Sequence, residues 1–320
     1  AVVIDHVAID QLPNHVLVDE TMSVPPQWTF EVHLRNTAKV TVAMPWIELT
    51  LTDAQDQAVM RKVIDLTPLG APRVLKPGGV LAATVPSWFP EKINDKLDAI
   101  ILGMHARKDN PELLKAQELG LKIFSYPEFI YEQTKNQLRV VIGGSHGKTS
   151  ITSMILHVLN YQDIAVDYMI GASLSGFENS VYLSETNDFI LLEGDEYLSS
   201  PIDLRPKFHL YKPQIALISG IAWDHVNVFP TQEDYNKQFE IFIDSITPGG
   251  VLVYNDEDAT LASLSAASPN TIRKEAYQTP DFVIEKGTTY LETDEGPLPL
   301  EIFGNHNLSN LAGAKWICQL

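Results

Sequence analysis

The sequence contains a single cysteine, Cys318, among 320 residues. One thiol can form neither a disulfide within the chain nor a zinc site built from several cysteines, and the lack of disulfides fits a reducing compartment. The first ten residues, AVVIDHVAID, show no basic segment followed by an apolar one, so no signal peptide is expected. No apolar run approaches the roughly 18–20 residues of a membrane helix. We therefore predict a cytoplasmic protein without a membrane partner.

Basic residues are also scarce, with 23 Lys and Arg against 41 Asp and Glu and a net charge of −18. A nucleic-acid backbone would be repelled by this charge, and no dense Lys/Arg cluster offsets it, so nucleic acid is excluded as a partner. An acidic chain can still bind a nucleotide, because loop amides, one lysine and a metal ion act locally. The ordinary consequence of the charge is solubility.

The segment 1–88 lacks a strongly amphipathic helix and instead alternates apolar and polar residues. Period-two alternation in WTFEVHLRN (28–36) and WIELTLTD (46–53) is typical of strands with one buried face. We predict a small antiparallel β-sandwich. Its histidines, His6, His15 and His33, are scattered and do not have the spacing of metal ligands.

From about residue 89 the pattern changes to alternating strands and helices, which predicts an α/β fold with a parallel sheet. The apolar runs predict strands at 97–104, 121–126, 138–144, 189–194, 214–221 and 249–255. Helices are predicted at 110–120, 127–135 and 148–161, the first of them with proline in its first turn and glycine at its end. In the helix at 148–161, Ile151, Met154, Ile155 and Val158 are expected on one side.

The sequence GGSHGKTS (143–150) lies between a predicted strand and a predicted helix. Glycines that let the backbone approach a ligand, followed by a helix N-terminus, are typical of a phosphate-binding loop. Lys148 would reach the β- and γ-phosphates, and the Thr149 hydroxyl would bind Mg²⁺. The generic pattern G-x-x-x-x-G-K-[ST] requires glycine where this chain has Ile142. The alternative is an ordinary strand–turn–helix connection.

The spacing G-x-x-G-K-T-[ST] resembles the ATP loop of the Mur ligases and their folate-pathway relatives. LLEGDEY (191–197), AWDHVNVFP (222–230) and GNHNLSN (304–310) follow in the order of that family's motifs. The resemblance implies that ATP is bound by Gly144, Ser145, His146, Gly147, Lys148, Thr149, Ser150, Asn307 and Asn310. It implies Mg²⁺ ligands at Thr149, Glu193 and His225, and catalytic roles for Lys148, Glu193 and His225. Taken singly, the later motifs are also typical of an acidic loop, a capping pair and a helix cap.

Within this family, the segment 177–250 is most similar to the murein peptide ligase branch. That branch joins UDP-N-acetylmuramate to the tripeptide L-alanyl-γ-D-glutamyl-meso-diaminopimelate through an acyl phosphate, so ATP, Mg²⁺ and these two substrates are the expected ligands. Some relatives carry a carbamylated lysine where this chain has Glu240, so that role is not assigned. Two alternatives stay open: a ligase that adds L-alanine to UDP-N-acetylmuramate, and a non-enzymatic β interaction module joined to a degenerate phosphate-loop domain.

The resemblance divides the chain into a β-sandwich-like domain (1–88), part of a UDP-binding α/β domain (89–138) and the central ATP-binding domain (139–320). The family's third, C-terminal domain is expected to be missing. Residues 1–88 resemble a terminal β domain of a proteobacterial family of unknown function, through IELTLTDAQDQAV (47–59). We expect a fusion of unrelated segments, joined near Ser87 to Pro90, that binds ATP weakly if at all and does not ligate by itself.

Overall fold

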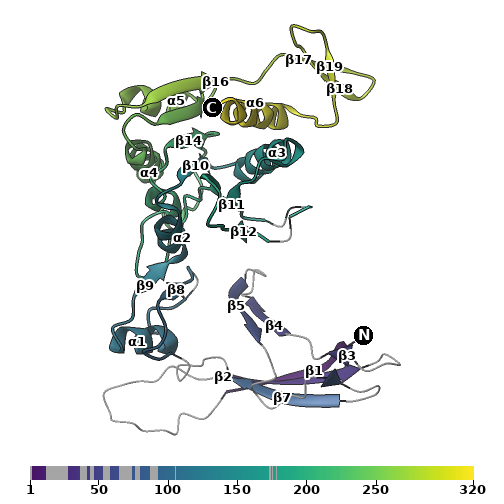
Figure 1. Ribbon diagram of the computed structural model, residues 1–320, viewed down its shortest axis with the longest axis vertical. Helices are drawn as coiled ribbons and strands as arrows, with labels where there is room; N and C mark the ends of the chain where they lie inside the picture. Colours follow the sequence, from purple (N-terminus) through teal and green to yellow (C-terminus); the bar gives the residue numbers. More distant parts are fainter. Residues whose placement is uncertain are drawn as a thin grey trace. The chain divides into compact units, whose positions relative to one another are not determined.

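The computed structural model describes residues 93–320, apart from 105, 173, 175 and 178, together with the backbone of strands within residues 2–86. Its contacts divide the chain into two units, residues 1–124 with 200–202, and residues 125–199 with 203–320. None of the described helices is both long enough and apolar enough to cross a membrane. The elements of both units are drawn in Figure 1.

The first unit begins with antiparallel strands. β1 (Val2–Gln11), β2 (Trp28–Asn36) and β7 (Val80–Pro86) form a three-stranded sheet with β2 in the middle. Two further pairs are β3 (Val42–Ala43) with β6 (Val74–Leu75), and β4 (Ile47–Thr52) with β5 (Ala58–Ile64). The strands predicted at 28–36 and 46–53 are therefore confirmed. The packing of these strands into a sandwich lies outside the described residues.

The same unit continues with β8 (Ile100–Leu102), α1 (Pro111–Glu118) and most of β9 (Ile123–Ser125). α1 begins where the sequence predicts, because Asn110 caps it and accepts hydrogen bonds from the N–H groups of Glu112 and Leu113. Gly120, with φ +64°, follows the end of the helix. The observed helix therefore begins and ends close to the positions predicted from the sequence.

The second unit is built on a seven-stranded sheet with the order β12-β11-β13-β10-β14-β15-β16. All neighbouring pairs are parallel except β11 with β12. The strands are β10 (Leu138–Gly143), β11 (Asp167–Met169), β12 (Val181–Tyr182), β13 (Phe189–Glu193), β14 (Ile215–Ile218), β15 (Val251–Asn255) and β16 (Arg273–Tyr277). The helices are α2 (Tyr126–Thr134), α3 (Lys148–Tyr161), the 3₁₀-helix η3 (Lys207–Leu210), α4 (Gln232–Ser245), α5 (Ala259–Ala267) and α6 (Asn305–Gln319). The parallel α/β fold predicted from the sequence is confirmed.

A small antiparallel meander stands apart from this sheet. It is made of β17 (Phe282–Glu285), β18 (Thr288–Leu291) and β19 (Leu298–Leu300). The chain leaves β16 to form it and then returns through α6 (Figure 1).

Helices cover both faces of the large sheet, and a cluster of buried apolar side chains lies on each face (Figure 1). On one face α3 and α6 pack against the strands through Ile151, Ile155, Ala314, Ile317, Val140 and Ile142. On the other face α2, η3, α4 and α5 pack through Ile130, Phe208, Phe239, Phe242, Leu261 and Val141. Val140, Val141 and Ile142 thus alternate between the two faces, as successive strand residues must.

The boundaries of α3 match the predicted helix at 148–161, but its buried face differs in part. The buried residues are Ile151, Thr152, Ile155 and Leu156, whereas Val158 is 40% exposed. Val158 lies about a quarter turn from the centre of that stripe, because helical residues are spaced about 100° apart. Val158 therefore lies on the predicted side of the helix with Ile151 and Ile155, but outside the buried stripe.

The order of the strands determines where a ligand can bind. After β10 the chain builds β11 and β13 on one side, and then crosses to build β14, β15 and β16 on the other. In open α/β sheets, ligands bind outside the carboxyl ends of the strands at such a change of direction. The loops that follow β10, β13 and β14 meet at this place.

Arg139, at the beginning of β10, fastens neighbouring segments to the sheet. Its buried guanidinium donates hydrogen bonds to the carbonyls of Thr134 at the end of α2 and of Tyr211 and Lys212 after η3. Replacing Arg139 by lysine, which lacks the planar fork of donors, is expected to lower the free energy of unfolding by about 3 kcal/mol. Urea denaturation would measure this, with the exposed Arg107→Lys as the control, and equal losses would contradict it.

Candidate functional site

The loop between β10 and α3 requires glycine at its two ends. Gly144 has φ +125° and Gly147 has φ +77°, in the region that L side chains rarely adopt. A Cβ atom on Gly147 would lie 2.3 Å from Oδ1 of Asn310, and one on Gly144 would lie 2.9 Å from the backbone N of Ser219. The two glycines of the predicted phosphate loop thus allow the backbone conformation of the loop. They also allow Asn310 and Ser219 to pack closely against it.

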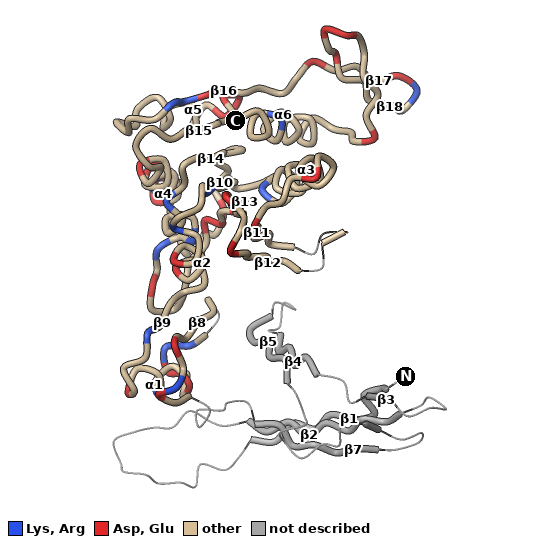
Figure 2. Tube along the Cα trace, viewed as in Figure 1, with Lys and Arg blue, Asp and Glu red and all other residues tan. Residues whose placement is uncertain are grey.

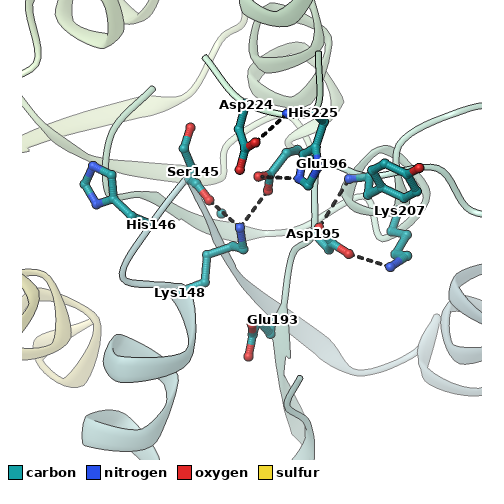
Figure 3. A network of polar contacts seen from close by, with 12 residues as sticks. Ser145, His146, Lys148, Glu193, Asp195, Glu196, Lys207, Asp224 and His225 are labelled. Atoms are coloured by element: carbon teal, nitrogen blue, oxygen red, sulfur yellow. Dashed lines mark hydrogen bonds and ion pairs between the residues drawn. The ribbon is translucent and has the colours of Figure 1, made fainter. Parts of the chain in front are cut away.

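Lys148 is the first residue of α3, and its amino group turns back toward the loop. Nζ donates hydrogen bonds to the Gly144 carbonyl and to Oε2 of Glu196, each at 2.7 Å (Figure 3). The Lys148 side chain is 13% exposed and that of Glu196 is 1% exposed. The lysine expected to bind phosphates is therefore fixed at the loop by a buried carboxylate.

The second oxygen of Glu196 faces two other groups. The Tyr235 hydroxyl donates to Oε1 at 3.2 Å, and Nε2 of His225 lies 3.4 Å from the same atom. Burial, followed by the neighbouring Glu196 charge, raises the pKa of Tyr235, so its hydroxyl stays protonated. The same hydroxyl lies 2.8 Å from Oγ of Ser145. Glu196 therefore connects the phosphate loop to His225.

Glu193 and Thr149 form a second pair beside this network. Oγ1 of Thr149 donates to Oε1 of Glu193 at 2.8 Å, and the Gly171 N–H donates to Oε2 at 2.9 Å. Among the residues that sequence analysis proposed as Mg²⁺ ligands, the structure thus brings Thr149 and Glu193 into contact. It places the third, His225, beside Glu196.

Within the described part of the chain, Asp195, Glu196 and His225 form a group of possible metal ligands. One ligand atom from each lies within 4.8 Å of the others. Two carboxylates and one imidazole nitrogen suit a divalent cation, and Mg²⁺ in particular favours carboxylate oxygen. The backbone of His225 has φ +55°, a conformation that costs energy and is frequent at functional sites. The residues present therefore fit a metal ion.

Lys207 holds Asp195 in this group. The two side chains form an ion pair, and both lie among the labelled residues of Figure 3. Burial opposes ionisation of Asp195, but the charge and hydrogen bond of Lys207 outweigh it and hold the pKa of this carboxyl below its usual value. Asp195 is therefore ionised at neutral pH, as a metal ligand must be.

Cavities lie on both sides of the phosphate loop. The larger, of about 380 Å³, is lined by Tyr126, Lys148, Met169, Gly171, Glu193, Asp195 and Lys207. The smaller, of about 80 Å³, is lined by His146, Ser219, Asn255, Glu257, Thr279, Asn305, His306, Ser309 and Asn310. The loop residues Lys148 and His146 thus face different cavities.

The residues that the sequence predicts near a nucleotide differ in whether they line the smaller cavity. Asn310 is buried against Gly147 and lines the smaller cavity. Asn307, four residues after Phe303, donates to the Phe303 carbonyl at 2.9 Å, so its amide is engaged within the start of α6. Ser150 is exposed in the first turn of α3. Asn305 and His306, from the same motif, line the cavity although sequence analysis did not select them.

Other residues of the site were also missed. Glu196 and Asp195 stand in the acidic motif at 191–197, where Glu193 alone was selected. Lys207 stands in the segment RPKFHLY (205–211), and Tyr235 is the fourth residue of α4. Asp195 and Glu196 lie within a motif that the sequence indicates, whereas nothing in the local sequence around Tyr235 indicates a contact with Ser145.

The distribution of Lys and Arg residues gives the electrostatic setting of the site. Lys and Arg residues are scattered along the described trace rather than gathered in one patch, as the sequence predicts (Figure 2). The cations near the loop, Lys148 and Lys207, are each paired with an acidic side chain. Each of these two lysines therefore lies beside a carboxylate rather than within a basic patch.

The fold and the loop together define a phosphate-loop α/β domain, with a parallel sheet, a glycine-rich turn and a helix that begins with Lys148. The family described as the Mur ligase middle domain matches residues 142–318, and the chain belongs to the Mur ligase family. Residues 8–86 match a second family, DUF3426, described as a protein of unknown function. Both resemblances expected from the sequence are confirmed.

Curated relatives match well over half of the chain. A protein of Frankia alni named UDP-N-acetylmuramate–L-alanine ligase is 30% identical over 201 residues, which are 61% of this chain and 33% of the relative. A protein of Lactobacillus acidophilus with the same name is 30% identical over 240 residues, 71% of this chain and 50% of the relative. The chain thus spans about a third to a half of the length of these relatives.

Solved structures show the same fold. A UDP-N-acetylmuramate:L-alanyl-γ-D-glutamyl-meso-diaminopimelate ligase from Neisseria meningitides has a TM-score of 0.64 at 22% identity, covering 72% of this chain and 76% of that one. A murein peptide ligase from Psychrobacter arcticus has a TM-score of 0.58 at 19% identity, covering 72% of this chain and 54% of that one. At these identities the likeness concerns the fold.

Proposed function

We propose that this chain carries the ATP-binding part of an ATP-dependent amide-bond ligase of peptidoglycan synthesis or recycling. The observation that carries the proposal is the phosphate loop with Lys148 held at its edge, beside two further sets of polar residues, Thr149 with Glu193 and Glu196 with His225. UDP-N-acetylmuramate stands in the names of both curated relatives and of the Neisseria enzyme, and it is the proposed acid substrate. The proposed acceptor is a murein tripeptide, and the proposed location is the cytoplasm.

The nucleotide is assigned to the loop and the smaller cavity. The N–H groups between Gly144 and Gly147, together with the N-terminus of α3, would hold its phosphates, since unpaired amides and the helix dipole favour anions. Lys148 would add a charge-assisted hydrogen bond. Asn310, buried against Gly147, would support the loop beside the nucleoside. His146 lines the same cavity from the loop side.

The proposed metal ion is Mg²⁺, and its proposed ligands are Thr149, Glu193 and His225. Glu196 and Asp195 lie beside these ligands. When bound, Mg²⁺ supplies positive charge that stabilises the phosphate oxygens during phosphoryl transfer. The Tyr235 hydroxyl keeps its proton and donates a hydrogen bond to Oε1 of Glu196.

The chemistry is activation of a carboxylate. The carboxylate oxygen attacks the γ-phosphorus of ATP, the bond to the β-phosphate bridging oxygen breaks, and an acyl phosphate and ADP result. The peptide amine then attacks the acyl carbon, loses a proton and expels inorganic phosphate as the amide forms. Lys148 offsets the charge that moves onto the β-phosphate. The larger cavity, which Lys148 and Lys207 both line, is the proposed place of the reacting carboxylate.

The proposed organisation follows the sequence division into 1–88, 89–138 and 139–320. The two family matches, at 8–86 and 142–318, support separate origins for the first and third parts. We propose that 1–88 is a β domain with no part in the ligase reaction, and that this chain alone does not form the amide. Amide product from the purified chain, with ATP, Mg²⁺ and both substrates, would overturn the last point.

Calorimetric titration of ATP into the chain, with and without Mg²⁺, tests the proposal. We expect binding that strengthens by at least about tenfold in Mg²⁺, because the metal offsets repulsion between phosphates and the acidic residues of the site. Absence of binding in both titrations would favour a degenerate phosphate-loop domain that serves as an interaction module.

A second candidate is an L-alanine-adding ligase, because both curated relatives carry that name. Both candidates share ATP, Mg²⁺ and UDP-N-acetylmuramate and differ in the amine. Binding of the tripeptide and of L-alanine to the chain saturated with Mg²⁺ and a non-hydrolysable ATP analogue would distinguish them. Competition by L-alanine, with no effect of the tripeptide, would favour the second candidate.

A further inference from the structure

We infer that Glu196 is a positioning residue that couples nucleotide binding to metal binding by controlling Lys148. The inference rests on the proposed function, in that Lys148 is taken to bind phosphate. Glu196 holds the Lys148 amino group through one carboxylate oxygen and faces His225 through the other. A phosphate would therefore compete with Glu196 for Lys148, whereas a divalent cation near His225 would be attracted to the other oxygen of the same carboxylate.

The geometry makes this link specific to Glu196. Its side chain is 1% exposed, so its two oxygens contact protein groups rather than bulk solvent. Glu193 is engaged with Thr149 and with the Gly171 N–H instead. Asp195 is engaged with Lys207. Of these three acidic residues of the motif, Glu196 is thus the one that accepts a hydrogen bond from the lysine of the phosphate loop.

The electrostatic consequence is large because the pair is buried. A carboxylate 2.7 Å from Nζ cancels much of the positive charge that Lys148 can offer to a phosphate. A phosphate must therefore either draw Lys148 away from Glu196 or bind a lysine whose positive charge is largely cancelled. Either way, Glu196 reduces the affinity for nucleotide when it is not itself neutralised.

A cation beside His225 changes this balance. Positive charge next to Oε1 of Glu196 reduces the hold of that carboxylate on Lys148, and the lysine becomes available to phosphate. By thermodynamic linkage, nucleotide must strengthen metal binding by the same factor. Tyr235 and His225 both contact Oε1 of Glu196. These contacts hold the Glu196 carboxylate between the proposed positions of the cation and the phosphate.

The test compares Glu196→Gln with the parent chain by titrating ATP in EDTA and in Mg²⁺. Glutamine keeps the shape of the side chain but removes the charge, and it replaces one of the two acceptor oxygens with an NH₂ donor. We expect ATP without metal to bind about tenfold more tightly to the variant, and the enhancement by Mg²⁺ to shrink by about the same factor. A residue that served the fold alone would weaken both titrations together.

Glu196→Asp is the second variant, and it keeps the charge while withdrawing the carboxylate from Lys148 by one methylene. It is also expected to tighten binding in EDTA, which separates the contact from the charge. Glu193→Gln is the matched control, because it removes a charge from the same site without touching a partner of Lys148. Circular dichroism and thermal unfolding would verify that each variant is folded.

The outcomes separate the inference from the function on which it rests. If the parent chain binds ATP in Mg²⁺ but neither Glu196 variant binds more tightly in EDTA, the inference is wrong and the proposed function stands. If Glu193→Gln tightens binding as much as Glu196→Gln, general charge reduction explains the effect and the inference is again overturned. If the parent chain binds no ATP under either condition, both proposals fail.

Discussion

Replacing Lys148 by methionine is expected to abolish magnesium-dependent binding of ATP and to destabilise the fold at the same time. The ammonium group provides the charge expected at the phosphates, and its loss should weaken binding by about a hundredfold or more. The same change leaves the buried carboxylate of Glu196 without its cation, which is expected to lower the free energy of unfolding by about 3 kcal/mol. Calorimetry with ATP and urea denaturation would measure the two effects.

The double variant Lys148→Met with Glu196→Gln separates these effects. Removing the uncompensated charge should restore most of the stability, whereas ATP binding should stay lost. Lys237→Met is the matched control, because Lys237 is 61% exposed and pairs with Glu240 one turn along α4. Its loss should change stability by less than about 0.5 kcal/mol. Retention of ATP affinity within about threefold in Lys148→Met would contradict the assignment of the phosphate loop.

The second large effect is expected from Gly144→Ala. An added Cβ would lie 2.2 Å from Oγ of Ser219 and 2.9 Å from its backbone nitrogen, and φ at this position is +125°. The side chain can rotate away but the backbone cannot, so the loop must move. We expect a loss of about 3 kcal/mol or more in the free energy of unfolding, together with loss of ATP binding.

Gly249→Ala isolates the cost of the backbone conformation from the cost of the clash. Gly249 has φ +80°, and nothing lies within 4 Å of its added Cβ. Its replacement should cost about 1 kcal/mol. Urea denaturation of both variants would show the difference, and equal losses would mean that the packing of Gly144 against Ser219 has little energetic weight.

Much of the second unit is predictable from local pattern. The helix at 148–161 and the strands β10, β13, β14 and β15 follow from buried apolar runs bounded by glycine, since a parallel strand covered on both faces is apolar throughout. The motifs also located the loop, the acidic segment and the Asp-His pair. These are features that a few neighbouring residues determine.

The side-chain contacts within the site are harder to predict from the sequence. Tyr235 meets Ser145 across 90 positions of sequence, through packing of α4 against the sheet, and no local pattern encodes that contact. The choice between Glu193, Asp195 and Glu196 also depends on which neighbour each carboxylate meets in space. Asn307 and Asn310 share one motif, yet the turn of α6 buries only Asn310 of the two.

The central position of β10 has a consequence for the motions of the domain. β10 is hydrogen-bonded to β13 on one side and to β14 on the other, so its amide hydrogens are shielded from solvent until the sheet itself opens. The phosphate loop continues directly from this strand and inherits a rigid support at one end. Nucleotide bound there would slow hydrogen exchange throughout the sheet and raise the melting temperature of the entire domain, because it stabilises the state from which every opening begins.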